Sequence, residues 1–363
     1  MILEKTKIYG VDGMGTMNGT LVRTDDAAEL TAGVVDGKIQ SDFDRCYPWS
    51  DITEVIDKHD NVFMKIPKFY SRIMENSDGT LKLQISGLRY DGFSTLFVND
   101  LGEEIDYILV GKYESSGDIQ VYGADNYYGE IFSKSGKSVV TGFDIDTMFK
   151  CIQSQYGDGY CSYDIWIDAI IKQLFTVEFA TTSCKSVLLG NLCGSAAQRT
   201  GYTDTVEQPT GGNVADGEHG ILDGGAIKYR GIENPWGNCR VFCDGITFLP
   251  YANYVSATIR YSLAGNLPPV TTGRKHEIKR LICVSRFPLL LLPSVVSSGS
   301  LPSVFYDGIY HYSGGNKYLY VGGGFGDGID EDHTGTIGGL WNFCLGGISA
   351  SANATCRLCY KPV

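Results

Sequence analysis

The sequence predicts an α+β protein with mainly short antiparallel strands and two helices near the middle of the chain. Three observations support this fold class. Apolar and polar residues alternate in the first 140 residues, the apolar spacing becomes helical between about 141 and 182, and the remainder returns to short strands and glycine-rich turns. Because turns rather than helices connect most of the expected strands, the pattern argues against a doubly wound βαβ fold.

Alternating apolar residues mark the strands of the N-terminal region. The clearest alternation runs over 62–73, where Pro67 indicates an edge strand or a bulge because proline cannot donate to a strand ladder. Turn-forming residues separate the other expected strands, which lie at 7–11, 20–24, 81–85 and 107–113. We expect an N-terminal attachment segment at 1–60 and a β-rich domain at 61–140.

Two helices are expected where the periodicity is helical. The first is capped by Asp144 and ended by Gly157, which can adopt a left-handed conformation. Its apolar face comprises Ile145, Met148, Phe149 and Ile152. The second begins at Ser162 or Asp164 and repeats apolar residues at three- and four-residue steps. No comparable helix is expected after it, and the polar segment 198–220 is expected to be a long surface loop.

Composition and charge exclude several classes of protein. The chain has 363 residues with 30 Lys and Arg against 42 Asp and Glu, so acidic residues outnumber basic ones. Proteins that bind nucleic acid electrostatically carry clustered basic residues, so this class is excluded. The longest apolar run, 281–296, is interrupted by Arg286, Pro288 and Pro293, so no transmembrane helix is expected. The first residues lack the apolar stretch of a signal peptide, so we expect folding in a reducing cytoplasm with most of the 11 cysteines reduced and buried.

Common catalytic motifs are incomplete in this sequence. Gly136, Lys137 and Ser138 lack the glycine that a phosphate-binding loop needs at position 131. The glycine-rich segment 322–328 is not followed by a helix pattern, which argues against a dinucleotide site. None of the five histidines lies in a hydrolase motif. We therefore expect a protein that is not an enzyme.

Two groups of residues carry side chains that bind metals. The first is an acidic cluster beside a histidine, formed by Asp327, Asp330, Glu331, Asp332 and His333. It offers hard ligands for Ca²⁺, but its spacing is not that of an EF-hand, and an acidic solvated loop is the commoner meaning. The second is the pair Cys356 and Cys359, which Cys239 and Cys243 could complete as a zinc site, with buried thiols as the simpler interpretation. We expect no cofactor, with Ca²⁺ as the alternative.

Several longer motifs resemble a known family. The segment from Tyr229 to Ile246 resembles the part of formylglycine-generating-enzyme-like C-type lectin folds that contains an asparagine, a Gly-Asn motif with aromatic residues, and an aspartate. The segment from Gly338 to Tyr360 resembles the C-terminal variable region of proteins diversified by retroelements. Shorter motifs resemble phage and prophage tail proteins with such endings, at 23–28, 43–49, 63–70, 91–93, 111–114 and 177–181.

Cysteines depart from the family pattern at several positions. The family commonly has apolar or aromatic residues where this chain has Cys239, Arg240 and Cys243, and Gly or Ser where it has Cys356 and Cys359. These cysteines are either buried thiols or products of diversification. Mutation of the adenines in an AAY codon yields Cys but never Lys, Glu, Gln, Met or Trp, and the segment 342–356 contains none of these five types.

The resemblance implies a C-type-lectin-like ligand-binding domain at 141–363, with a variable region at about 338–360. In such a fold, a packed core holds an irregular surface whose side chains can change at little cost in stability. The expected contact surface consists of Asn342, Phe343, Cys344, Ser349, Ser351, Asn353 and Thr355, with Tyr310 and Tyr312 at its edge. The residues assigned to the scaffold are Leu340, Trp341, Arg357 and Leu358.

The function that the resemblance implies is adhesion by a receptor-binding protein of a phage or prophage tail. Its expected partners are a host cell-surface protein or glycan and other tail proteins, with no nucleic acid, no membrane insertion, assembly as a homotrimer, and a location in the virion tail. The alternative is a copper-dependent formylglycine-generating oxidase that would use Cys356 and Cys359. A bacterial surface adhesin encoded outside any phage is a third hypothesis, for which a signal peptide or anchor is expected.

Overall fold

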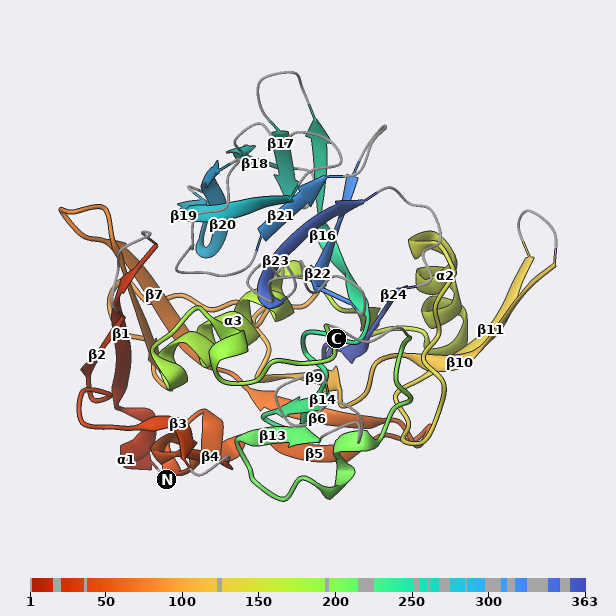
Figure 1. The fold of residues 1–363 in the computed structure, drawn as a ribbon, viewed down its shortest axis with the longest axis horizontal. Helices are drawn as coiled ribbons and strands as arrows, with labels where there is room; N and C mark the ends of the chain where they lie inside the picture. The colour runs from red at the N-terminus through yellow and green to blue at the C-terminus, as the bar shows by residue number, and fades with distance from the viewer. Residues whose placement is uncertain are drawn as a thin grey trace.

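The computed structural model combines short strands in mostly antiparallel sheets with two longer helices, which is the α+β class expected (Figure 1). The structure describes residues 2–15, 21–35, 38–122, 126–192, 196–214, 225–250, 255–259, 262–267, 275–284, 286–297, 308–311, 317–324, 339–346 and 353–363. No helix within these ranges is long and apolar enough to cross a membrane.

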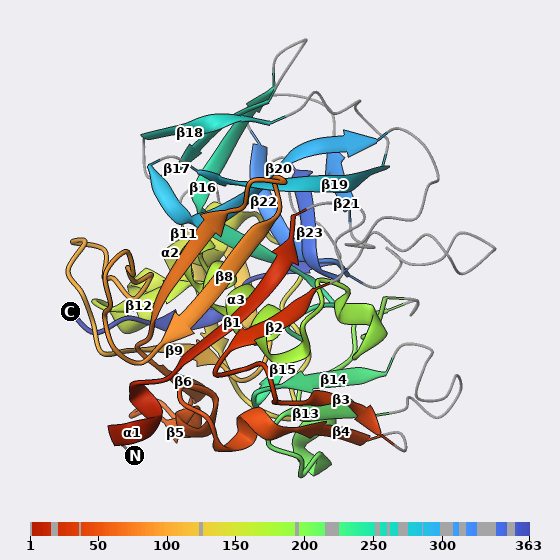
Figure 2. The same cartoon turned by 90° about the vertical axis from the view of Figure 1, so that its left-hand side faces the viewer.

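The first sheet is antiparallel and has the strand order β2-β1-β8-β7. Its strands are β1 (Ile8–Met14), β2 (Val22–Asp25), β7 (Tyr70–Glu75) and β8 (Leu81–Ser86). In Figure 2, β2, β1 and β8 lie side by side on the face toward the viewer. A short helix, α1 (Ile2–Lys5), precedes this sheet.

The second sheet joins strands from distant parts of the chain in the order β12-β25-β9-β6-β5. Its strands are β5 (Thr53–Ile56), β6 (Val62–Pro67), β9 (Tyr107–Gly111), β12 (Tyr160–Ser162) and β25 (Leu358–Tyr360). The last strand of the chain therefore pairs with β9 and β12, in the middle of the sequence.

The strand expected over 62–73 is two strands in different sheets. β6 ends at Pro67, which lacks the N–H needed to extend the ladder, and β7 begins at Tyr70 in the first sheet. The edge-strand interpretation of Pro67 is wrong, because β6 pairs with β5 on one side and with β9 on the other. The proline is tolerated because it is the last residue of the strand.

Smaller elements complete the molecule, most of them in the lower part of Figure 1, while the hairpin of residues 116–132 projects at its right-hand side. Two hairpins and a three-stranded sheet comprise β3 (Ala32–Val35) with β4 (Lys38–Ser41), β10 (Ser116–Tyr122) with β11 (Asn126–Phe132), and β13 (Gly211–Val214), β14 (Ala226–Tyr229) and β15 (Ile232–Glu233). The 3₁₀ turns are η1 (Asp42–Arg45), η2 (Trp49–Asp51), η3 (Cys184–Ser186) and η4 (Tyr202–Thr205). The segment 198–220 is thus not wholly a surface loop, since it contains η4 and β13 and buries Thr203; residues 215–220 lie outside the described residues.

Both expected helices are present with the expected aspartate caps. α2 (Ile145–Tyr156) begins after Asp144, whose carboxylate accepts from Thr147 N, and ends at Gly157, which has φ of +77°. α3 (Ile165–Phe179) begins after Asp164, not after Ser162. Every residue of α3 is buried, because the helix lies between the first sheet and the C-terminal strands and contacts β1, β8, β16 and β20 (Figure 1).

The third sheet has nine strands and forms the upper part of the molecule in Figure 1. Its main path is β18-β17-β16-β22-β23-β21-β19-β20, and β24 pairs with β16. Its strands are β16 (Arg240–Pro250), β17 (Val255–Ile259), β18 (Ser262–Leu267), β19 (Lys275–Val284), β20 (Phe287–Ser297), β21 (Gly308–His311), β22 (Lys317–Gly322), β23 (Gly339–Gly346) and β24 (Ala354–Thr355). Pairing is antiparallel except between β21 and β23 and between β16 and β24.

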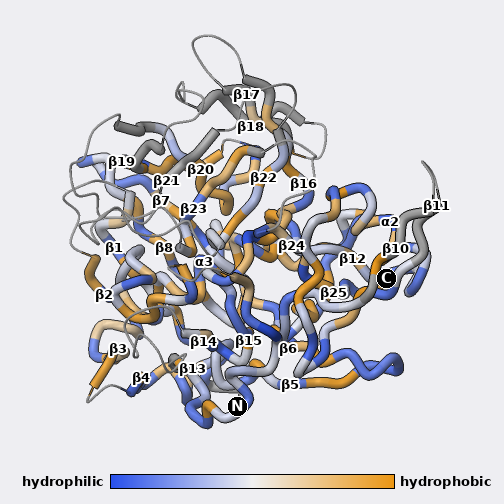
Figure 3. The backbone as a smooth tube through the Cα atoms, turned by 45° about the vertical axis from the view of Figure 1, so that its right-hand side comes forward, coloured by the Kyte–Doolittle hydropathy of each residue, from blue (hydrophilic) through white to orange (hydrophobic). Residues whose placement is uncertain are grey.

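One main hydrophobic cluster runs through all three segments that the sequence suggested as separate units. It includes Tyr9 and Trp49 from 1–60, Ile66 from 61–140, and Phe175 and Cys359 from the remainder. A second cluster gathers around α2 and the ends of β16 and β22. In Figure 3, hydrophobic segments coloured orange gather near β20, β22 and β23. The boundaries at residues 60 and 140 therefore do not separate hydrophobic cores.

Candidate ligand-binding sites

Four of the residues expected to contact a ligand are buried. Asn342, Phe343 and Cys344 lie in β23 and have relative exposures of 0%, 1% and 1%, and Thr355 in β24 has 0%. β23 is flanked by β21 and β22. Phe343 enters the main cluster and Cys344 the second cluster, so both faces of the strand are covered. The expected contact surface does not include these four residues, which belong to the interior.

The structure describes only some of the other expected contact residues. Asn353 is half-buried, and its backbone carbonyl accepts from Arg240 N at 2.8 Å. Tyr310 belongs to β21, and its side chain is outside the described residues. Ser349, Ser351 and Tyr312 lie outside the described residues altogether. The scaffold assignment is confirmed, because 2% or less of the residue surface is exposed at Leu340, Trp341, Arg357 and Leu358.

The family-like motif around Asn234 forms a buried polar centre. We use this name for Glu114, Asn234, Asn238 and Arg357, each exposed by 1% or less. The Glu114 carboxylate accepts from the side-chain amides of Asn234 and Asn238, and from Cys239 N at 3.0 Å. Glu114 therefore joins its own segment to the motif at 234–239, which lies more than 100 positions later in the sequence.

Arg357 closes the polar centre with its guanidinium. It donates to the backbone carbonyl oxygens of Gly111 at 2.9 Å and Glu233 at 2.8 Å, and also to those of Lys112 and Asn234. Burial raises the pKa of Glu114 to about 7, although Arg357 and the two asparagines act in the opposite direction. A carboxyl with so little exposure is suited to holding the chain together, since a substrate cannot reach it.

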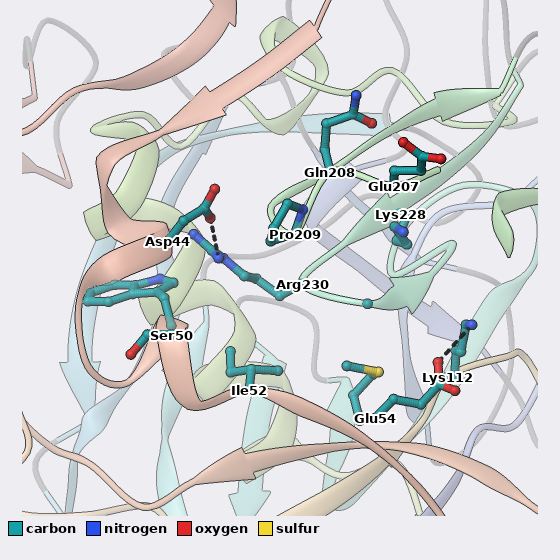
Figure 4. A pocket seen from close by; sticks show the side chains of 13 residues that line it. Asp44, Ser50, Ile52, Glu54, Lys112, Glu207, Gln208, Pro209, Lys228 and Arg230 are labelled. Carbon is teal, nitrogen blue, oxygen red and sulfur yellow. Dashed lines mark hydrogen bonds and ion pairs between the residues drawn. The ribbon is translucent and has the colours of Figure 1, made fainter. Parts of the chain in front are cut away.

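The pocket in Figure 4 lies where η2, β5 and β6 meet β14 and has a volume of about 240 Å³. Lys112 forms ion pairs of 2.9 Å with Glu54 and with Asp204. Arg230 pairs with Asp44 at 2.7 Å. This volume is below the ~300 Å³ at which small-molecule pockets usually begin, so the charges stabilise the junction rather than offer an open site.

The third cation of this pocket, Lys228, is also engaged. Its ammonium group donates to the backbone carbonyl of Val206, and burial lowers its pKa. Arg230 makes a further ion pair with the fully buried Glu178. The sequence contains no motif that predicts this pocket, because the residues at 44–64 and those at 207–231 that line it are more than 140 positions apart.

A larger cavity, of about 430 Å³, lies between α2 and β12, and we call it the α2 cavity. Its lining combines apolar and polar side chains, among them Phe149, Gln153, Tyr160, Ser162 and Asp244. The sequence patterns predict none of these residues as a ligand contact. They come from several separated segments, so only the folded chain brings them together.

The cysteines suggested as a copper-binding pair point to different clusters. Cys356 belongs to the second cluster and Cys359 to the main cluster, and burial raises the pKa of both thiols to about 12. Burial also raises the pKa values of Cys239 and Cys243 well above the usual range. Thiolates are the form that binds copper or zinc, so these environments do not favour a metal site.

Within the described ranges, no group of three or more His, Cys, Asp or Glu residues is arranged to hold a metal ion. The acidic segment 327–333, which carries the Ca²⁺ hypothesis, lies outside those ranges. A scan against protein-family models found no match, and a search of curated proteins found none either.

Proposed function

We propose that this chain is a receptor-binding protein of a phage or prophage tail, in which a C-type-lectin-like frame displays a diversifiable surface for adhesion to a host cell. The observation that carries the proposal is the polar centre. Three of the segments that resemble the family, 111–114, 229–246 and 338–360, meet there through Glu114 and Arg357. Motifs that resemble one family along the sequence thus also form one buried structural unit.

The proposed contact surface is smaller than the sequence suggested. It retains Ser349, Ser351 and Asn353, with Tyr310 and Tyr312 at its edge. The first three follow β23 and precede or adjoin β24, and both strands are buried where they flank this segment, at Leu345 and Ala354. Substitutions between two anchored ends can change a binding surface at little cost to the core.

The oxidase alternative is less well supported by the geometry. A copper site formed by two cysteines needs both sulfur atoms to converge on one ion. Cys356 and Cys359 instead enter different clusters. This difference favours adhesion over oxidation as the role of the C-terminal segment.

Cell binding provides the direct test. The fluorescently labelled full chain is titrated against a panel of bacterial strains by flow cytometry, and saturable binding to at least one strain is expected. The double variant Ser349→Arg/Ser351→Arg should lose this binding because it places two bulky cations on the proposed surface. Ser77→Arg/Ser138→Arg, at two exposed serines far from the C-terminal segment in sequence, is the matched control and should bind normally.

Two outcomes would reject the proposal. One is the absence of saturable binding to every strain, and the other is equal binding by the test and control variants. The genomic locus offers an independent check, since a diversified protein requires a reverse transcriptase gene and a template repeat that matches the 3′ end of the coding sequence. Light scattering tests the homotrimer that tail proteins commonly form.

A further inference from the structure

The α2 cavity has the size of a site for a small organic ligand. Its volume of about 430 Å³ falls within the range of roughly 300–1,000 Å³ that such pockets occupy. One wall comes from α2 and the other from β12, with the turn at 99–101 and Asp244 of β16 completing it. All of these residues belong to the described structure.

The apolar part of the lining includes two aromatic side chains, Phe149 and Tyr160, beside aliphatic residues such as Ile152. Phe149 is half-buried on α2. The Tyr160 ring stacks on Tyr156 with ring centroids 4.6 Å apart, and its hydroxyl donates to Asp57 at 2.9 Å. Rigid aromatic rings provide contact area at little cost in conformational entropy. Such rings suit a ligand that presents both C–H groups and hydroxyls.

One polar group in the lining is buried without a hydrogen-bond partner. Ser162 is only 6% exposed, and its hydroxyl has no partner in the described part of the chain. An unsatisfied buried hydroxyl costs about 1–3 kcal/mol, so buried polar atoms of this kind need a reason. Ser162 is one of the residues that line the cavity, and the inference assigns the missing hydrogen bond to an oxygen or nitrogen of the ligand.

The charge of the lining selects among ligands. Three carboxylates line the cavity, at Asp100, Asp158 and Asp244. The one cation in the lining, Lys361, is 3% exposed and ion-paired with Asp164. Excess negative charge repels acidic ligands and favours hydroxyl and ammonium donors.

We infer that the α2 cavity binds a neutral or amino-bearing saccharide of one or two rings. As a site for a host receptor this inference rests on the proposed function, because it names a glycan as a class of ligand for adhesion. It does not depend on the C-terminal contact surface, which involves none of the residues that line the cavity.

A glycan array probed with the full chain tests the inference, followed by calorimetric titration of the best-bound glycan. Ser162→Ala should weaken this binding about three- to tenfold, which is the change in dissociation constant expected when one hydrogen bond is lost. The thermal midpoint should stay the same or rise, because the free protein loses no hydrogen bond. Ser154→Ala, on α2 but outside the cavity lining, is the matched control and should bind normally.

A second pair of variants tests the role of charge. Asp158→Lys should abolish binding of amino-bearing glycans, whereas Asp146→Lys, an equally exposed aspartate on α2 outside the lining, should not. The inference is overturned if the array shows no bound glycan, if acidic glycans bind best, or if Ser162→Ala and Asp158→Lys both bind like the unmodified chain.

The two proposals fail in different ways. Glycan binding that depends on Ser162, without binding to any cell, would keep the saccharide site and reject adhesion. Cell binding that depends on Ser349 and Ser351, with no glycan bound on the array, would keep adhesion and reject the saccharide site.

Discussion

Glu114 is a buried carboxyl whose hydrogen bonds all come from the segment that resembles the lectin-like family. Its partners are the side chains of Asn234 and Asn238 and the amide of Cys239. The two asparagines belong to the motif from Tyr229 to Ile246 that resembles the family, but this motif does not reveal that Glu114, more than 100 positions earlier, accepts their hydrogen bonds. Such pairings depend on the whole fold and carry no local signal.

The first prediction concerns the pH dependence of stability at Glu114. Burial raises its pKa from 4.5 to about 7, so the folded chain binds this proton more tightly than the unfolded chain. The resulting stabilisation is fully present below about pH 4.5 and is lost as the pH rises through about 7. Between pH 5 and pH 8, the free energy of unfolding of Glu114→Gln should therefore fall by about 2 kcal/mol less than that of the unmodified chain. Urea unfolding at several pH values measures this difference.

Two other buried carboxyls, Asp168 and Glu233, also have pKa values that burial raises. Both are present in the unmodified chain and in the variant, but the charge of Glu233 is one cause of the raised pKa of Glu114. Glu114→Gln therefore measures the titration of Glu114 together with its coupling to Glu233. Glu29→Gln, at an exposed carboxylate, is the control and should leave the pH slope unchanged. If Glu114→Gln has the same slope as the unmodified chain, Glu114 is charged over this whole range and the prediction is wrong.

The AAY-codon pattern of the C-terminal segment does not predict that the side chains of β23 are buried. The set of residues reachable from an AAY codon concerns mutation, and it contains no information about packing. A signal was nevertheless available in the run from Leu340 to Leu345, which is apolar on both alternating faces except at Asn342. Such a continuous run is typical of a strand covered on both sides, as the exposures of Phe343 and Cys344 confirm.

At the scale of elements, helices were predictable and strand partners were not. The helix caps are local signals: Asp144 caps the first helix as predicted, and Asp164, one of the two candidates beside Ser162, caps the second. The pairing of β6 with β9, or of β25 with β12, links residues tens to hundreds of positions apart. Alternation predicts that a strand exists, whereas its neighbours depend on the packing of the complete chain.

The second prediction compares the two helix caps. Asp144 accepts from the backbone and side chain of Thr147, so Asp144→Ala should lower the free energy of unfolding by about 1 kcal/mol. Asp164 caps α3 through Trp166 N and Ile167 N and also pairs with the buried Lys361. Asp164→Ala should therefore cost about 3 kcal/mol or more.

Chemical denaturation monitored by far-UV circular dichroism measures both costs. The two substitutions delete the same side chain at the same helix position, so each serves as the control for the other. Equal losses of stability would contradict the claim that the Asp164–Lys361 pair ties α3 to the end of the chain.

At the scale of the whole molecule, the three segments expected from the sequence share one core. Trp49 of the first segment donates to the carbonyl of Leu174 in α3. Glu178 at the end of α3 accepts from Ser41, Tyr229 and Arg230. Strand alternation and the change to helical spacing are local patterns, so they do not reveal that one hydrophobic cluster spans residues 60 and 140.

The third prediction follows from this shared core. Glu178→Ala leaves the 4%-exposed Arg230 with Asp44 as its remaining described ion pair, so the free energy of unfolding should fall by about 3–5 kcal/mol. Asp44→Ala should cost less, because Asp44 is 27% exposed and its removal keeps the Glu178 pair. Glu178→Gln keeps the shape of the side chain and replaces the alanine variant in the experiment if that variant does not fold.

Calorimetry and hydrogen exchange measure the effect in each variant that folds. Calorimetry should record one transition at a lowered midpoint. Hydrogen exchange in 38–51 and in α3 should accelerate together, because both segments lose the same ion-paired contact. A separate early transition that frees residues 1–60 alone would mean that the N-terminal segment folds as its own unit.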